Sequence, residues 1–83
     1  MSAGQITQGR RIHDDQFSPG DYGLVGGVWH ARAPRGHLGN LANHSVTEHE
    51  DGTITVSPSI LITDGETRDQ WHGFLEHGVW REA

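Results

Sequence analysis

The chain has 83 residues, enough for one hydrophobic core and too few for two. Only 33% of the residues are hydrophobic and 12 are glycine, so turns take much of the length and the core is thin. A net charge of −5 without any basic stripe argues against nucleic acid as a partner, and the lack of cysteine excludes disulfides, cysteine zinc sites and thiol catalysis.

The sequence carries no membrane or cofactor signal. No apolar run approaches the roughly 20 residues that span a bilayer, and the first residues are polar, unlike a signal peptide. We therefore expect a cytoplasmic protein that binds no cofactor and no membrane. Because small chains with thin cores often rely on association, a homodimer is one way to complete the fold.

Residues 1–20 combine glycine, serine and proline with almost no apolar periodicity. This composition predicts a flexible N-terminal arm. Regular structure is expected to start near Asp21, so residues 21–83 form the single β domain.

The next elements are a hairpin and a loop. Two short apolar runs between Tyr22 and Arg32 flank Gly26-Gly27, a pair that supplies the positive φ angles of a tight hairpin turn. Residues 34–41 hold one proline and two glycines, which predicts a loop.

A second hairpin is predicted over residues 44–57. Asp51-Gly52 separates two segments of alternating character, and Ile54 and Val56 lie two apart, as an inward face requires. Pro58 then has no amide to donate, so we expect the ladder to end there or the segment to lie at a sheet edge.

The stretch from Thr63 to His77 fits two structures. Trp71, Phe74 and Leu75 would share one helical face. Gly73 weakens a helix interior, however, and Gly78 lies between two apolar pairs as the turn of a third hairpin would. We favour the hairpin.

Together these segments predict an all-β fold, a small antiparallel domain of about six short strands in three sequential hairpins. Its core should consist of the large apolar side chains. These are Tyr22, Leu24, Val28, Trp29, Ile54, Val56, Ile60, Ile62, Trp71, Phe74, Leu75, Val79 and Trp80.

Seven histidines make a metal site worth considering, because histidine is the commonest metal ligand. His44 and His49 are five positions apart, as are His72 and His77. On a single strand this spacing directs the members of each pair to opposite faces. The spacing argues against chelation.

A serine and a histidine form the candidate catalytic pair. Ser59 follows Pro58 at the predicted strand end, and the hairpin order brings His72 near it as a base. A third group, Asp51, Asp64 or Glu76, would have to orient the imidazole. The alternative is that Ser57 and Ser59 are ordinary turn serines bonded to nearby backbone.

The three tryptophans, Trp29, Trp71 and Trp80, either fill the core or anchor a binding patch. We expect at least two of them in the core. An outward aromatic strip beside acidic residues would suit a protein partner.

Two strings of the C-terminal half carry a family resemblance. DGTITVSPSI at residues 51–60, followed by WHGFLEHGVW at residues 71–80, resembles the BubE-like family. That family is associated with bacterial ubiquitin-like operons and is thought to include peptidases; Ser59 and His72 match its motif serine and histidine. Gly-Asp-Tyr at 20–22 and Pro-Arg-Gly at 34–36 resemble short actinobacteriophage proteins. The resemblance implies a phage protein acting in the host cytoplasm.

Two functions follow as expectations. The first is a small phage accessory protein, non-catalytic, that binds a host or phage protein. It is favoured by the small size, the acidity and the absence at residues 33–41 of the family's cysteine-rich loop. The second is a small serine hydrolase or peptidase in which His72 activates Ser59.

Overall fold

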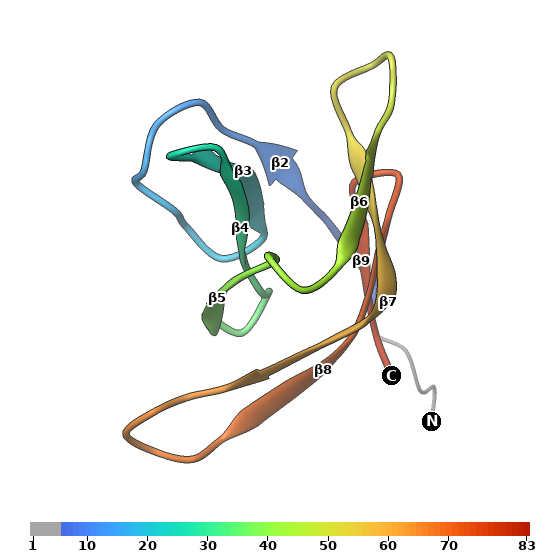
Figure 1. Ribbon diagram of the computed structural model, residues 1–83. Coiled ribbons are helices and arrows are strands. Elements are labelled where there is room, and N and C mark those ends of the chain that lie inside the picture. The colour runs from blue at the N-terminus through green and yellow to red at the C-terminus, as the bar shows by residue number, and fades with distance from the viewer. Residues whose placement is uncertain (1–5) are drawn as a thin grey trace.

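The computed structural model describes residues 6–83 and confirms an all-β chain, with two facing sheets (Figure 1). The five-stranded sheet has the order β1 (Ile6–Gln8), β9 (Val79–Glu82), β8 (Gln70–Glu76), β7 (Ile54–Thr63) and β6 (Ser45–Glu48). The four-stranded sheet has the order β2 (Arg10–Arg11), β3 (Asp21–Val25), β4 (Val28–Arg32) and β5 (Leu38–Asn40). The described part thus holds nine strands where about six were expected. It contains no helix that could cross a membrane.

The three predicted hairpins are present, as β3–β4, β6–β7 and β8–β9. Gly26 and Gly27 make the first turn with φ angles of 60° and 81°, which residues with a Cβ rarely adopt. The helical alternative for residues 63–77 is wrong. Along β8, Trp71, Gly73 and Leu75 are buried and alternate with less buried residues, and this period of two is that of a strand.

Three short strands lie where the sequence predicted an arm and a loop. β1 pairs with β9, and β2 pairs in parallel with β3, so residues 6–8 and 10–11 of the expected arm belong to the sheets, while residues 1–5 lie outside the described part. β5 lies inside the expected loop and pairs with β4. Strands of two or three residues have no periodicity to detect, and their partners fix them.

The β6–β7 ladder ends at Ser57, directly before Pro58, as expected, although the strand itself does not end there. β7 continues through Pro58, and the register with β8 shifts between Val56 and Ile60. A proline has no amide for the ladder, and a bulge is where a ladder bond is already missing.

The core lies between the sheets. Trp71 and Trp80 are fully buried and meet edge to face, with ring centroids 5.3 Å apart, which confirms that at least two tryptophans belong to the core. Five predicted core residues lie outside it or only partly within it: Leu24, Val28, Trp29, Phe74 and Val79. Four that were missed are buried: Ile12, Ala31, Ala33 and Leu41.

Candidate functional site

Ser59 and His72 lie side by side on the outer face of the five-stranded sheet. Ser59 lies in the bulge of β7, and His72 is on β8 directly opposite Leu61. The Nε2 atom of His72 is 3.0 Å from the Ser59 hydroxyl oxygen. The imidazole is exposed and the serine is half-buried. This contact is the geometry of a nucleophile with its base.

No third group orients the imidazole among residues 6–83. Asp51 accepts hydrogen bonds from the hydroxyl and backbone N–H of Thr53, and the hydroxyl bond above all lowers the pKa of Asp51. Asp64 accepts two backbone N–H groups of its own turn. Glu76 lies 3.9 Å from an arginine of β9. The pair is therefore a dyad, without a carboxylate to hold the His72 tautomer.

A second histidine holds the same serine from the other side. The Nε2 atom of His44 is 3.1 Å from the Ser59 carbonyl oxygen. A carbonyl only accepts, so this nitrogen donates a proton to it. The Nδ1 atom of His44 is buried and has no hydrogen-bond partner in the described chain.

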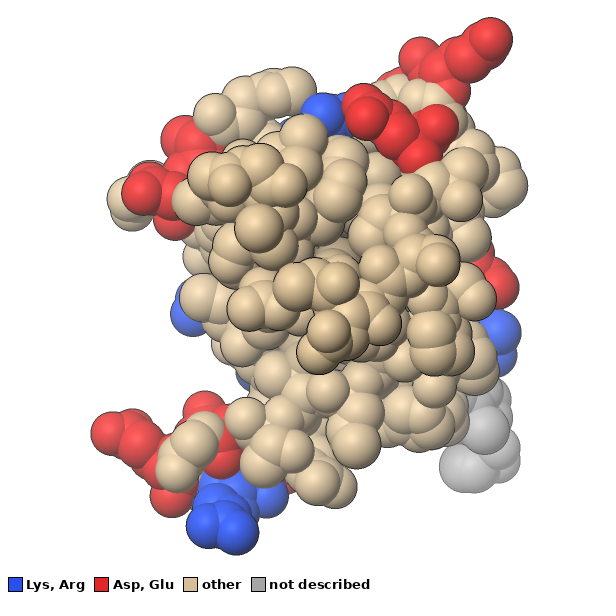
Figure 2. Space-filling view, viewed as in Figure 1, with Lys and Arg blue, Asp and Glu red and all other residues tan. Residues whose placement is uncertain are grey.

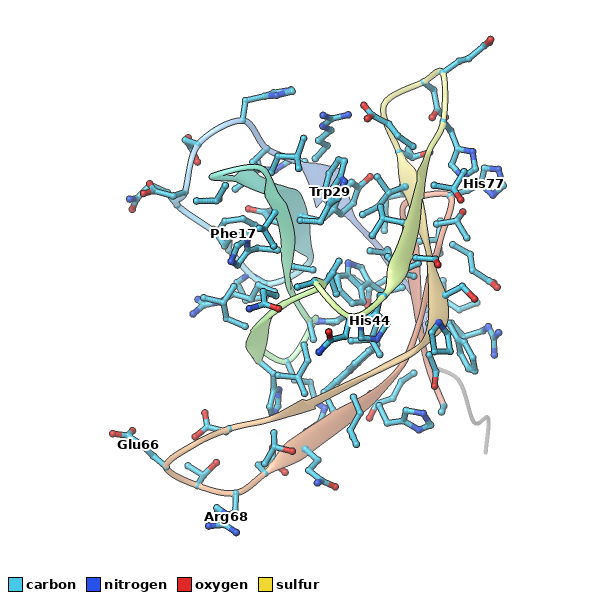
Figure 3. All side chains as sticks on the ribbon, viewed as in Figure 1. Phe17, Trp29, His44, Glu66, Arg68 and His77 are labelled. Atoms are coloured by element: carbon cyan, nitrogen blue, oxygen red, sulfur yellow. The ribbon has the colours of Figure 1, made fainter. Side chains whose placement is uncertain are left out.

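His44 also lines a groove of about 380 Å³ that opens between the two sheets. Figure 3 places Trp29 and His44 in the space between the sheets. The lining contains no Asp, Glu, Lys or Arg and comes from the β3–β4 hairpin, from the 41–44 turn and from β6. It consists of Gly27, Val28, Trp29, Leu41, Ala42, His44 and Val46.

Arg11 connects the two sheets beside Trp29. Its guanidinium carbon lies 5.0 Å from the centre of the Trp29 ring, as a cation–π contact requires. The same guanidinium donates to the Glu48 carboxylate and to the Gly52 carbonyl of the β6–β7 turn. Trp29 is thus held as a half-buried wall of the groove.

On the face drawn in Figure 2, the charged side chains lie around the edge and not at the centre. Figure 2 shows a broad uncharged centre with acidic groups gathered at its margin, over the β6–β7 turn and over the segment between β2 and β3. A further charged group lies over the β7–β8 turn, where acidic and basic side chains mix.

The members of each of the two histidine pairs do not share a strand, although the predicted divergence had assumed that they do. His44 and His49 lie just outside the ends of β6, and His77 is in the turn after β8. His49 and His77 stack with ring centroids 3.9 Å apart, a contact that the sequence does not indicate. Within residues 6–83, no three metal-ligating side chains gather into a site.

The sequence singled out Ser59 and His72 and missed the groove. Trp29 was predicted as a core residue or as an anchor of a binding patch, and His44 was considered only as a metal ligand. No signal in the sequence joins them, because the groove depends on how two sheets face each other. Comparison with protein families, curated proteins and solved structures finds no match to the chain.

Proposed function

We propose that the chain is a non-catalytic protein-binding module that takes a segment of its partner into the groove between the two sheets. One observation carries this proposal: a groove of about 380 Å³, whose lining contains no Asp, Glu, Lys or Arg, has a half-buried tryptophan as its wall. Tryptophan is among the residues that most often dominate binding energy at protein interfaces. The phage resemblance adds that the partner is a host or phage protein.

The groove suits a side chain rather than a large ligand. Its volume is near the lower limit of binding pockets, which is about 300 Å³. Its lining offers apolar contact from Val28, Trp29 and Val46, and the protonated nitrogen of His44 is already used by Ser59. An apolar anchor residue of a peptide fits this chemistry.

Selection from a random dodecapeptide display library tests the proposal. Ala42 is exposed and lines the groove, so Ala42→Arg fills the opening without disturbing the core. Gln8→Arg is the matched control, because Gln8 is exposed on β1, at the opposite edge of the same sheet from β6. We expect peptides that bind the wild type and the Gln8 variant and fail to bind the Ala42 variant.

Two results would overturn the proposal. One is a library without peptides that bind the wild type above background. The other is a set of peptides that bind the Ala42→Arg protein as tightly as the wild type. Circular dichroism of both variants checks that each remains folded.

Serine hydrolysis is a second candidate function, favoured by the 3.0 Å contact between the Ser59 hydroxyl and His72. In this role His72 Nε2 takes the hydroxyl proton as the oxygen attacks a carbonyl carbon. The match of both residues to the BubE-like motif supports the same pair.

A fluorophosphonate probe separates the two candidate functions. Hydrolysis predicts covalent labelling of the wild type that disappears in Ser59→Ala and in His72→Ala. Labelling that survives either substitution contradicts the assignment. The binding module predicts that Ser59→Ala retains the affinity of the wild type for the selected peptides.

A further inference from the structure

We infer that the partner segment is basic, with Lys or Arg residues flanking the apolar residue that enters the groove. This inference rests on the proposed function and adds the chemical class of the partner. It comes from the charges on two sides of the groove, which belong to segments far apart in the sequence.

Acidic side chains gather on two sides of the face that Figure 2 shows, and the groove wall Trp29 lies between these two sides in the matching view of Figure 3. One is the connection from β2 to β3, and the other is the end of the β6–β7 hairpin. Their carboxylates are those of Asp14, Asp15, Glu48, Glu50 and Asp51, which we call the acidic margin.

Only one carboxylate of the acidic margin, that of Glu48, forms an ion pair within residues 6–83. Arg11 binds Glu48, and Arg10 binds the buried Asp21. The other contacts are with uncharged groups: Asp14 accepts from the Gln16 backbone, and Asp51 from Thr53. Most of the margin's charge therefore remains available to a partner.

A separate group of charged residues lies near the β7–β8 turn, and it differs from the acidic margin because two of its carboxylates form ion pairs. In the β7–β8 region, Asp69 contacts both Arg35 and His37, and Arg35 also binds Glu82. Asp69 and Glu82 are paired within the chain, whereas Asp64 and Glu66 of the same turn form no ion pair in the described part. Unpaired carboxylates are therefore more numerous in the acidic margin, where a bound peptide would have its flanking residues.

An apolar centre and a charged border have separate roles in such an interface. The buried anchor supplies most of the affinity, and complementary charges at the rim set specificity and association rate. A basic peptide meets both conditions here. An acidic peptide with the same anchor would be repelled.

Sequencing the peptides recovered from the dodecapeptide library gives the first test. We expect Lys and Arg to exceed their frequency in the unselected library at positions beside an apolar residue. Recovery of peptides that need the groove but carry no such excess would overturn this inference and leave the proposed function intact. Recovery of no peptide would instead remove the proposed function.

Charge-neutralising variants give the second test, with one recovered basic peptide as the probe. Asp15→Asn with Glu50→Gln removes one charge from each side of the groove. Glu66→Gln with Glu76→Gln removes the same charge elsewhere and is the control. We expect the dissociation constant to rise about fivefold in the first protein and to stay within about twofold in the second. Equal affinity in both proteins would overturn the inference.

Discussion

The groove and the Ser59–His72 pair are built from different strands and in different ways. The groove draws on both sheets and on the 41–44 turn, so residues distant in sequence form its walls. The Ser59–His72 pair is built from β7 and β8 alone and lies on the open face of a sheet. The groove offers a ligand a concave surface with walls from both sheets. The pair offers reactive groups on a sheet face, without such walls.

Ser59 connects the two regions. His44 on the groove side binds its carbonyl, and His72 on the outer side binds its hydroxyl. The first bond satisfies a backbone group at a strand bulge. The second joins two partly exposed side chains. The two histidines should therefore differ in their contribution to stability, and substitutions can measure that difference.

Gly73→Ala should have the largest effect, because it removes the support of both regions. A Cβ at position 73 would lie 2.4 Å from the Arg81 carbonyl oxygen and 2.5 Å from a ring carbon of Trp71. We expect a loss of about 3 kcal/mol or more in the free energy of unfolding, measured with urea.

Gly65→Ala is the control for that substitution. A Cβ at position 65 meets nothing within 4 Å, and the residue does not have a positive φ. Its unfolding free energy should match that of the wild type. Similar losses in both variants would mean that close packing at Gly73 is not the cause.

His44→Ala should have an intermediate effect. The substitution leaves the Ser59 carbonyl without its donor and removes one wall of the groove. An unsatisfied backbone acceptor in a partly buried position costs about 1–3 kcal/mol. Urea unfolding measures this loss. A variant as stable as the wild type would show that the bulge does not depend on this bond.

His72→Ala should have a small effect, about 0.5 kcal/mol, because its side chain is exposed and water replaces the lost bond. The same unfolding experiment applies. A loss equal to that of His44→Ala would contradict the proposed difference between the two sides of Ser59.

The smallest predicted effect is on the pH dependence of stability and comes from Asp64, which lies in the β7–β8 turn, far from the groove. Backbone hydrogen bonds from Thr67, and next from Glu66, lower the pKa of Asp64 below 3.8. A lowered pKa adds stability at pH values above 3.8, and that part is lost as the pH falls through the folded-state value.

Carboxyl NMR titration should give a midpoint below 3.8 for Asp64. In Asp64→Asn, the amide oxygen still accepts both backbone bonds, so the turn should persist without this part of the acid sensitivity. A midpoint at or above 3.8 would contradict the turn geometry.

The hairpins were predictable because their signals are local. Gly26-Gly27, Asp51-Gly52 and Gly78 mark turns whose strands are neighbours in sequence, and alternation identified Ile54 and Val56 as the buried face of β7. The division into two sheets was not predictable. It depends on short strands such as β1, β2 and β5, which form only against distant partners.

The two candidate sites also differ in how far the sequence could predict them. Ser59 and His72 lie on consecutive paired strands, so sequence order suggested their proximity, although the bulge at Pro58 decided the register. The groove requires Trp29 and Val46 to face each other from different sheets. Sequence order does not determine that arrangement.

The most direct test of the groove is the NMR spectrum of the three tryptophan indole N–H groups during titration with a selected peptide. Trp71 and Trp80 are fully buried in the core, whereas Trp29 lines the groove. We predict that the Trp29 signal shifts in a saturable manner while the other two stay nearly unchanged. A bound peptide that leaves Trp29 unchanged and shifts the backbone signals of Leu61 and His72 would place binding on the outer face and contradict the account.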